Sequence, residues 1–360
     1  MERALNLIKE TLSTTFVNLL IPRVSSFCLV GGALRDAYFG VPLKDFDFVV
    51  REIDFKIIKN FLKAQKISHF FLNEEQFALL RANANNSTFD FMVLSGSIEE
   101  DINKRDFTIN SLYYDLRLDQ RFFKEEFLHD LQNRVLKVVN SNSIVFDPVR
   151  SLRGIRLASD LSLSVENNTK RLISGGVLLL ENVTKERVRE EVKKILHSDF
   201  RKLILVLKDL FGEDLNEVLP RIKLLDRMAM LEKEVNKDIS FKELCKASLL
   251  SKYFTFFLMG FTGREKKYID EITDLEIENN FDSMFGAFIK YMREIRIPLC
   301  AIVISFCLED VLKTYSLFDE WSRIKIDGYK IREGALTGKE IGRKKEDLLK
   351  DKCREIYDEI

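Results

Sequence analysis

The fold is decided by the stretch Leu29-Val30-Gly31-Gly32-Ala33-Leu34-Arg35-Asp36, which is soon followed by Asp45-Phe46-Asp47. The apolar run at 27–30 predicts a strand that ends at the two glycines, and a helix is expected to begin near Ala33. Residues 46–50 predict a second strand. Side chains two apart on a strand point to the same face. We therefore expect Asp45 and Asp47 to present two carboxylates side by side, with Phe46 buried behind them.

These features together predict a site for a metal ion and a phosphorylated ligand. Two adjacent carboxylates repel each other unless a cation lies between them. Oxygen ligands that leave room for phosphate and water suit Mg²⁺. Gly31 and Gly32 lack Cβ atoms, so a triphosphate can approach their backbone, and the following helix N-terminus favours its charge. Asp-x-Asp alone would favour a solvated turn, but the upstream Gly-Gly-x-x-Arg-Asp favours a functional site.

Two further motifs carry arginines. In Arg105-Asp106-Phe107-Thr108-Ile109-Asn110, Arg105 can bind phosphate through its forked donors. A helix is expected to start near Asp106, and Asp106 and Asn110 are expected to brace the local fold. The other motif is Phe146-Asp147-Pro148-Val149-Arg150-Ser151-Leu152-Arg153-Gly154-Ile155-Arg156.

This last motif predicts a base-reading helix. Pro148 suits a first helical turn with Asp147 as its cap, and Arg150 falls on the same helix face as Asp147. An acceptor beside a donor matches the amino group and ring nitrogen of cytosine or adenine, and it rejects uracil and guanine. The alternative is a capped helix start with a local ion pair. Arg153 is expected to reach phosphate, whereas Arg156 has a structural ion pair as its alternative role.

The rest of the chain changes character near residue 146. Before it, short strands are expected at 68–72, 77–81 and 88–94, after a helix at 4–20. Beyond it, helical periodicity dominates, at 148–160, 184–197, 199–211, 241–260 and 281–294. The sequence therefore predicts an α/β first part followed by an all-helical remainder.

Composition excludes several classes of function. Lys plus Arg and Asp plus Glu both number 57, which argues neither for nor against nucleic acid. Three dispersed histidines supply neither a histidine metal site nor a Ser-His-Asp triad, and five scattered cysteines indicate a reducing compartment. The most apolar run, 297–308, is too short to span a bilayer and is expected to be a buried helix. We expect a cytoplasmic protein that does not enter membranes.

In this order, the three motifs resemble those of class II tRNA nucleotidyltransferases and bacterial poly(A) polymerases. The segment Glu186-Arg187-Val188-Arg189-Glu190-Glu191 resembles the closing helical motif of that family, and residues 336–342 resemble its tail segment. The match covers residues 27–197 and the tail. Two positions depart from the family pattern, because Phe146 replaces a glutamate and Lys104 replaces an arginine.

The resemblance implies an α/β nucleotidyltransferase head (1–135), a neck with a base-reading helix (136–200), a helical body (201–300) and a helical, tRNA-binding tail (301–360). It implies two Mg²⁺ ions at Asp45 and Asp47. It implies nucleotide contacts from Gly32, Arg35, Arg105, Asp147, Arg150, Arg153 and Arg156. Asp90 lies where relatives carry a third acidic residue, which would activate the RNA 3′-hydroxyl or assist the metal; an ordinary strand-edge acid is the alternative.

The resemblance also predicts the reaction, in which CMP residues from CTP are added to the 3′ end of tRNA and pyrophosphate is released. In CCA-adding relatives a mobile loop lies between the third-acid strand and the Arg-Asp-Phe-Thr motif. Here only 14 residues separate Asp90 from Arg105, with a loop of about Ser95-Gly96-Ser97. This truncation resembles CC-adding enzymes, which leave the terminal A to a separate A-adding enzyme. The alternatives are a full CCA-adding enzyme or poly(A) polymerase that also uses ATP, and an inactive RNA-binding module.

Overall fold

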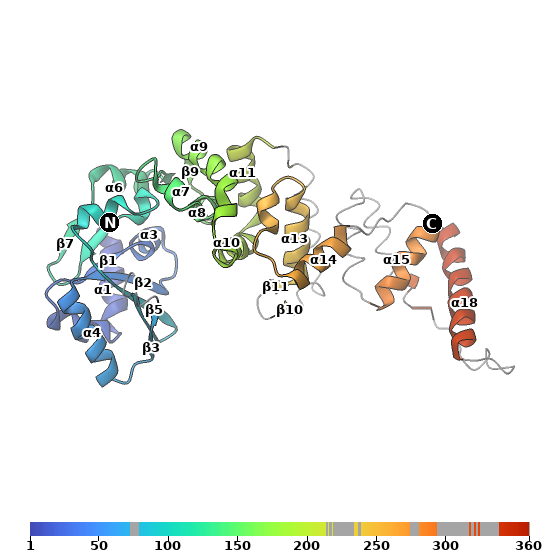
Figure 1. Ribbon diagram of the computed structural model, residues 1–360, viewed down its shortest axis with the longest axis horizontal. Helices are drawn as coiled ribbons and strands as arrows, with labels where there is room; N and C mark the ends of the chain where they lie inside the picture. The colour runs from blue at the N-terminus through green and yellow to red at the C-terminus, as the bar shows by residue number, and fades with distance from the viewer. Residues whose placement is uncertain are drawn as a thin grey trace. The chain divides into compact units, whose positions relative to one another are not determined.

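A computed structural model describes the chain in two units. The described residues are 1–72, 79–213, 215, 218, 234–236, 239–273, 281–293, 317, 320–321, 323–324 and 338–359. The first unit comprises residues 1–183 and 205–211, and the second comprises 184–204 and 212–360. Figure 1 shows the sheet in the first unit and helices in both. The predicted division into four parts stays a prediction.

The first unit is built on a seven-stranded sheet with the order β3-β4-β5-β2-β1-β6-β7. Its central pair, β2 and β5, is parallel, and every other pair is antiparallel. The strands are β1 (Cys28–Val30), β2 (Asp45–Val50), β3 (His69–Leu72), β4 (Leu79–Ala84), β5 (Ser87–Val93), β6 (Tyr113–Asp115) and β7 (Gln120–Phe122).

One face of this sheet is a buried aromatic layer. The rings of Phe48 and Phe91 stack with centroids 5.4 Å apart, and those of Phe27 and Phe48 lie 4.5 Å apart. Helix α4 (Glu52–Ala64) covers this face, since Phe55 contacts Phe71 of β3. Burying such side chains stabilises a fold by roughly 1.5–3 kcal/mol each. Because side chains alternate along a strand, the residues between these phenylalanines point to the opposite face.

The remaining elements of the first unit surround the sheet or follow it (Figure 1). The helices are α1 (Glu2–Ser13), α2 (Val17–Leu20), α3 (Gly32–Phe39), α5 (Ile98–Asn103), α6 (Glu125–Gln132), α7 (Ser143–Phe146), α8 (Val149–Leu161) and α9 (Asn167–Gly176). A short parallel pair joins β8 (Val135–Leu136) to β9 (Ser164–Val165). This pair ties the end of α8 to the segment that follows α6.

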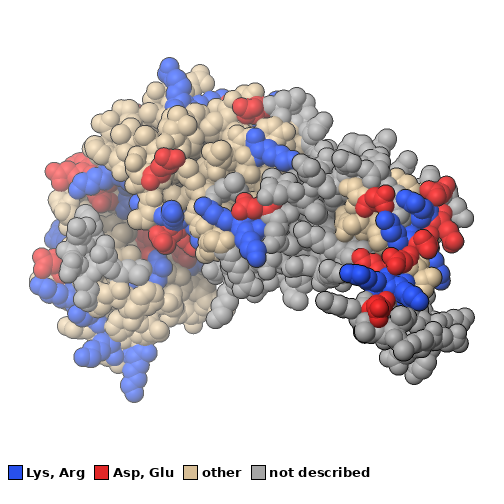
Figure 2. All heavy atoms as spheres, turned by 45° about the vertical axis from the view of Figure 1, so that its right-hand side comes forward, with Lys and Arg blue, Asp and Glu red and all other residues tan. Residues whose placement is uncertain are grey.

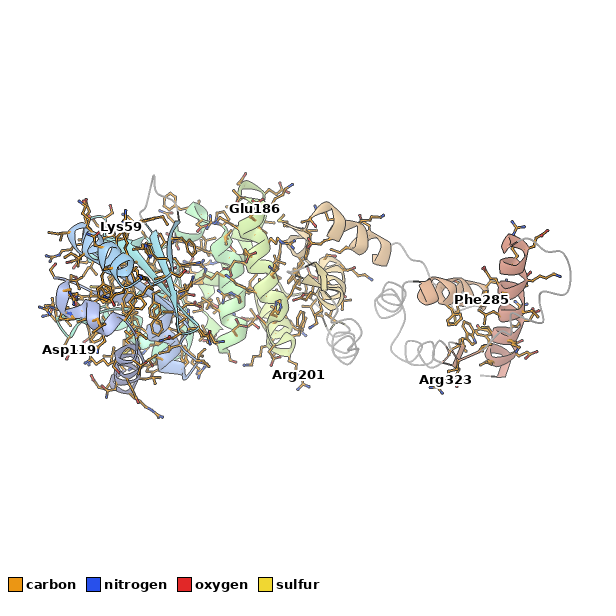
Figure 3. All side chains as sticks on the ribbon, turned by 90° about the horizontal axis from the view of Figure 1, so that it is seen from below. Lys59, Asp119, Glu186, Arg201, Phe285 and Arg323 are labelled. Atoms are coloured by element: carbon orange, nitrogen blue, oxygen red, sulfur yellow. The ribbon has the colours of Figure 1, made fainter. Side chains whose placement is uncertain are left out.

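The second unit is mostly helical, with one small hairpin of β10 (Glu234–Asn236) and β11 (Ile239–Ser240). Its helices are α10 (Lys185–His197), α13 (Phe241–Ser251), α14 (Gly263–Thr273), α15 (Phe281–Arg293) and α18 (Gly338–Glu359), whereas α11 (Phe200–Phe211) divides between the units. Arg189 binds the buried Glu265 through two nitrogens at 2.5 Å each. Phe285 faces α18, where Lys350 lies 5.9 Å from its ring centroid (Figure 3).

The predicted fold class is confirmed: a mixed sheet with helices precedes a helical remainder. The single helix expected at 4–20 is wrong, because it divides into α1 and α2. The hydroxyls of Ser13, Thr14 and Thr15 bond to carbonyls three residues back, and such side chains compete with helical hydrogen bonds.

Two other expected segments also differ from the structure. The helix expected at 241–260 ends at Ser251, and a 3₁₀ turn (Thr255–Leu258) follows it. The strand expected at 77–81 is β4, which begins at Leu79. The expected helix at 297–308 lies outside the described residues.

The described surface is mixed in charge. Lys and Arg side chains alternate with Asp and Glu side chains over the described part of the face in Figure 2. None of the described helices is both long and apolar enough to cross a membrane.

Candidate active site

Two acidic residues of β2 occupy the sheet face opposite the aromatic layer. Asp45 and Asp47 flank the buried Phe46, as the alternation predicts. Asp47 is the register partner of Asp90 on β5 and of Val30 on β1. Register partners point to the same side of a sheet, with neighbouring strands about 4.8 Å apart. Three carboxylates therefore gather where β2 meets β5.

Electrostatics at Asp47 favour a bound cation. Burial raises the pKa of Asp47 to about 6, and the nearby charges of Asp90 and Asp45 act in the same direction. Arg105 opposes this rise without cancelling it. An acid in this position is held neutral or paired with a positive charge.

The donor set fits Mg²⁺, which is commonly bound by one or two carboxylates while phosphates and waters complete its shell. Asp45 and Asp47 supply those two carboxylates. In the described part of the chain, no group of three Asp, Glu, His or Cys side chains could hold a metal by itself.

The backbone at Gly31 lies close to the Asp47 carboxylate. Its φ is +75°, a region that residues with a Cβ rarely adopt, and an added Cβ would lie 2.9 Å from Asp47 Oδ2. Helix α3 begins at Gly32, one residue earlier than expected. The sharp bend leaves the first turn of α3 beside the carboxylates, where its N–H groups can face an anion.

The predicted phosphate-binding arginines are already held by protein partners. Arg35 Nε donates to Asp36 Oδ1 at 2.8 Å, and its Nη1 donates to Asn110 Oδ1. Arg105 donates through Nε and Nη2 to Asp101, and through Nε to the Tyr113 hydroxyl at 2.6 Å. These contacts fix both guanidinium groups, which is what precise placement of a phosphate requires.

Asp106 is the buried centre of the second motif. Its Oδ1 accepts from the Phe107 backbone and from Asn110 Nδ2, and its Oδ2 accepts from Arg153 Nη1 at 3.0 Å. A short 3₁₀ turn (Thr108–Asn110) follows it in place of the expected helix. The bracing role expected for Asp106 and Asn110 is confirmed by these contacts.

The predicted base-reading pair adjoins the second motif. Arg150 Nε lies 3.6 Å from Asp147 Oδ2, so the expected pairing on one helix face is present. Arg150 also donates to the backbone carbonyls of Lys104 (2.7 Å) and Arg105 (3.2 Å) and to the Ser143 hydroxyl (2.7 Å). The guanidinium therefore joins the start of α8 to the segment that carries Arg105.

Two other expectations concern this helix. Asp147 as the cap is wrong by one residue, since Pro148 holds the cap position of α8. Arg156 Nη1 lies 3.8 Å from Asp160 Oδ2, the kind of ion pair that its alternative role predicts. Phe146, which replaces the family glutamate, is 82% exposed.

Sequence reasoning missed Arg81. Its Nε and Nη2 bind both oxygens of Asp90, at 2.7 and 2.6 Å, and the two residues are register partners. The register of β4 on β5 reveals this pair. The sequence signal for it was Asn85-Asn86, both at positive φ, which form the two-residue turn of this hairpin and so place Arg81 opposite Asp90. Asp90 lies on an interior strand and is 8% exposed, so it is not a strand-edge acid.

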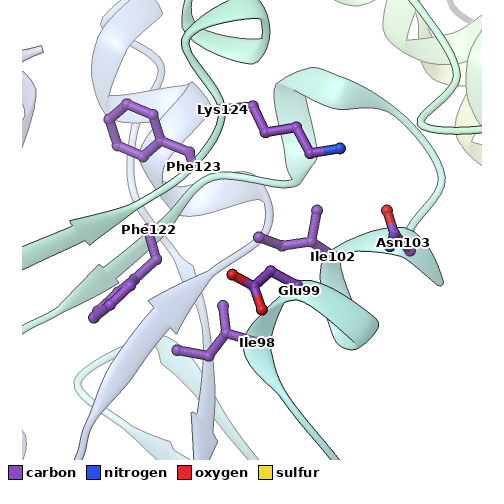
Figure 4. Close-up of a pocket in the computed structure, with 7 residues that line it drawn as sticks. All are labelled: Ile98, Glu99, Ile102, Asn103, Phe122, Phe123 and Lys124. Atoms are coloured by element: carbon purple, nitrogen blue, oxygen red, sulfur yellow. The ribbon is translucent and has the colours of Figure 1, made fainter.

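A cavity of about 470 Å³ lies elsewhere on the first unit (Figure 4). Apolar side chains of Ile98, Ile102 and Phe122 line it together with Glu99 and Lys124. The cavity shares no residue with the predicted site.

Known protein families match two segments of this chain. The "Poly A polymerase head domain" family matches residues 27–137, and the "Probable RNA and SrmB-binding site of polymerase A" matches residues 162–211. The sheet, the acids and the Arg105 motif all fall in the first of these ranges. Residues 27–137 are thus a nucleotidyltransferase head. Through these two segments the chain resembles the poly(A) polymerases and tRNA nucleotidyltransferases among its relatives.

Curated relatives match in part of their length. A CC-adding tRNA nucleotidyltransferase of Synechocystis sp. is 30% identical over 174 residues, which are 48% of this chain and 42% of that protein. Poly(A) polymerase I of Salmonella typhi is 30% identical over 196 residues, which cover 47% of this chain and 42% of that enzyme. The match thus spans less than half of these relatives.

Solved structures match the fold more widely. The Thermotoga maritima CCA-adding enzyme, solved with tRNA, has a TM-score of 0.69 at 21% identity and covers 94% of this chain, and the match covers 91% of that enzyme. A CCA-adding enzyme solved with CTP has a TM-score of 0.69 at 20% identity, with 98% of this chain and 93% of that one covered. At this identity the likeness concerns the fold.

Proposed function

We propose that the chain is a template-independent RNA nucleotidyltransferase that adds CMP residues from CTP to the 3′ end of tRNA. The observation that carries this proposal is the placement of Asp45, Asp47 and Asp90 on one sheet face, beside the Gly31 bend. This arrangement offers carboxylates for cations and backbone donors for phosphate within one small region.

In the proposed reaction, the RNA 3′-hydroxyl attacks the α-phosphate of CTP. A new P–O bond forms, the bond to the β-phosphate oxygen breaks, and pyrophosphate leaves. Mg²⁺ held by Asp45 and Asp47 would supply charge stabilisation and lower the hydroxyl pKa. Arg35 and Arg105 position the triphosphate, Asp90 accepts the hydroxyl proton, and Asp147 with Arg150 reads the base.

The proposal extends to product length: the enzyme adds two C residues and stops. Support comes from the connection between β5 and α5, which has only four residues, 94–97. Ser97 and Glu100 close it with a capping box, in which each side chain bonds the backbone of the other residue. A connection fixed in this way offers little of the hinge that a switch from cytosine to adenine requires. A separate A-adding enzyme would then complete the tRNA.

The test uses a tRNA that ends at its discriminator base. The protein is given each nucleoside triphosphate alone and then CTP with ATP, in the presence of Mg²⁺, and the products are sized. We expect extension with CTP by two nucleotides and none with ATP alone. Three added nucleotides ending in A would indicate a full CCA-adding enzyme, long A tracts would indicate a poly(A) polymerase, and no extension would indicate an RNA-binding module.

A further inference from the structure

The sheet face that carries the acids continues across β5, β4 and β3. Register partners on neighbouring strands form rows across this face. One row crosses β2, β5, β4 and β3 and consists of Asp47, Asp90, Arg81 and Phe70. The next row runs from Asp45 through Thr88 to Asn83. All of these side chains share one face because register partners point to the same side.

This face is buried at one end and open at the other. Val30, beside Asp47 on β1, is fully buried, whereas Phe70 on β3 is 44% exposed. The side chain of Arg81 is 36% exposed, and Asn83 is exposed as well. The exposed Phe70 ring and Asn83 side chain, together with the partly exposed Arg81 and Thr88 side chains, therefore extend from the acids towards the edge of the sheet. We call Phe70, Arg81, Asn83 and Thr88 the strand strip.

The chemistry of the strand strip suits the end of a single-stranded nucleic acid. Bases stack on exposed aromatic rings of a sheet, and arginine binds phosphate. Two Arg81 nitrogens bind Asp90, and among the described residues none accepts a hydrogen bond from its Nη1. That nitrogen is available for a phosphate oxygen while the ion pair with Asp90 stays intact.

Distances along the row fit this use. Phe70 lies three strands from Asp47, or about 14 Å at the usual strand spacing, and Arg81 lies between them. A 3′-hydroxyl at the acids would put the sugar-phosphate backbone over Arg81 and a base over Phe70. The buried side of the row, at Val30, leaves no comparable path in the other direction.

We propose that the strand strip binds the 3′-terminal nucleotides of the RNA that is to be extended, with Phe70 stacking on a base and Arg81 binding a phosphate. The inference rests on the proposed function, because it assigns the second substrate to a part of the same head. It gives Arg81 two contacts, one that orients Asp90 and one that places the RNA.

A kinetic comparison tests the strip. Phe70→Ala should raise the KM for the RNA about tenfold, and far more than it raises the KM for CTP. Ile53→Ala is the matched control, since Ile53 is 66% exposed on α4, which covers the opposite face. Asn83→Asp adds a negative charge to the strip and should also raise the KM for RNA, whereas Asn60→Asp, exposed on α4, should not. Equal RNA KM values for Phe70→Ala and Ile53→Ala would overturn the proposal.

A second experiment does not depend on catalysis. A tRNA with a photoreactive thiolated uridine at its 3′ end is bound to the whole protein without nucleotide, irradiated and digested. We expect cross-linked peptides from 69–72 or 79–93. A cross-link confined to other peptides would refute the strip. If the wild-type protein cross-links there but extends no RNA, the proposed function fails while the strip stands.

Discussion

Asp106 and Arg153 form an ion pair, with 3.0 Å between Oδ2 and Nη1, although 47 positions separate them in the sequence. Asp106 also accepts from Asn110, and Asn110 accepts from Arg35. A continuous series of polar contacts thus joins α3, which would face the triphosphate, to α8, which would face the base. A substitution of Asp106, at the centre of this series, should therefore disturb both the triphosphate side at α3 and the base side at α8.

Asp106→Asn should lower the stability in a pH-dependent way. Burial alone would raise the pKa of Asp106, but Arg153, Asn110 and the Phe107 backbone outweigh burial and bring the pKa below its usual value. The stabilisation is therefore present above the unfolded-state pKa, about 3.9, and is lost as the pH falls through the lower folded-state pKa. We expect a loss of about 2 kcal/mol at pH 7. Urea titrations from pH 7 to pH 3 should show the two proteins converging; a gap that stays constant or widens would contradict this.

Gly31→Ala should inactivate the enzyme, because the added Cβ falls 2.9 Å from Asp47 Oδ2 and must displace that carboxylate. We expect at least a hundredfold lower rate, which is what a misplacement of about 1 Å can cost. Gly40→Ala is the matched control: its φ is +73°, yet a Cβ there would meet nothing within 4 Å. Gly40, at ψ +24°, lies in the left-handed helical region, so Gly40→Ala should lose about 1 kcal/mol of stability. Gly31, at ψ −140°, lies outside that region, so Gly31→Ala should lose more stability, and only Gly31→Ala should lower the transfer rate. Similar rates for the two would argue against close approach at Gly31.

Asp45→Ala and Asp47→Ala should abolish nucleotide transfer while RNA binding persists. Thermal unfolding gives an independent readout, since Mg²⁺ should raise the Tm of the wild type and not that of either variant. A transfer rate within about tenfold of the wild-type rate, which corresponds to roughly 1.4 kcal/mol in the activation barrier, would show that these residues have no essential part in the reaction.

Asp147→Ala should relax the choice of base. Asp147 is the expected acceptor for the amino group of cytosine, and uracil offers no such donor. The ratio of kcat/KM for CTP to that for UTP should fall at least tenfold in single-nucleotide assays. Phe146→Ala, at the exposed neighbouring position, is the control and should retain the wild-type ratio. An unchanged ratio for Asp147→Ala would exclude the base-reading role.

Local patterns were enough to predict part of this site. Alternation placed Asp45 and Asp47 together with Phe46 buried behind them, and the glycine pair predicted the bend before α3. These features depend on neighbours in the chain, so a short stretch of sequence contains them.

Features that depend on distant segments were not predictable. The contacts of Arg150 with the carbonyls of Lys104 and Arg105 require α8 to meet another motif. The pairing of Arg81 with Asp90 is local by comparison, because the Asn85-Asn86 turn sets the β4–β5 register, and that turn was not recognised in the sequence. The break between α1 and α2 arises because side-chain hydroxyls compete for the backbone carbonyls. Hydrophobic periodicity carries no information about these hydroxyls.

The parallel pairing of β2 with β5 also has a kinetic consequence. Asp47 and Asp90 meet only after α4, β3 and β4 have completed the crossover between their strands. Closing such a long segment carries an entropic cost before any contact between the strands repays it. We therefore expect the acidic centre to be assembled late in folding, so that a newly made chain gains its capacity for metal and nucleotide only once the whole sheet has closed.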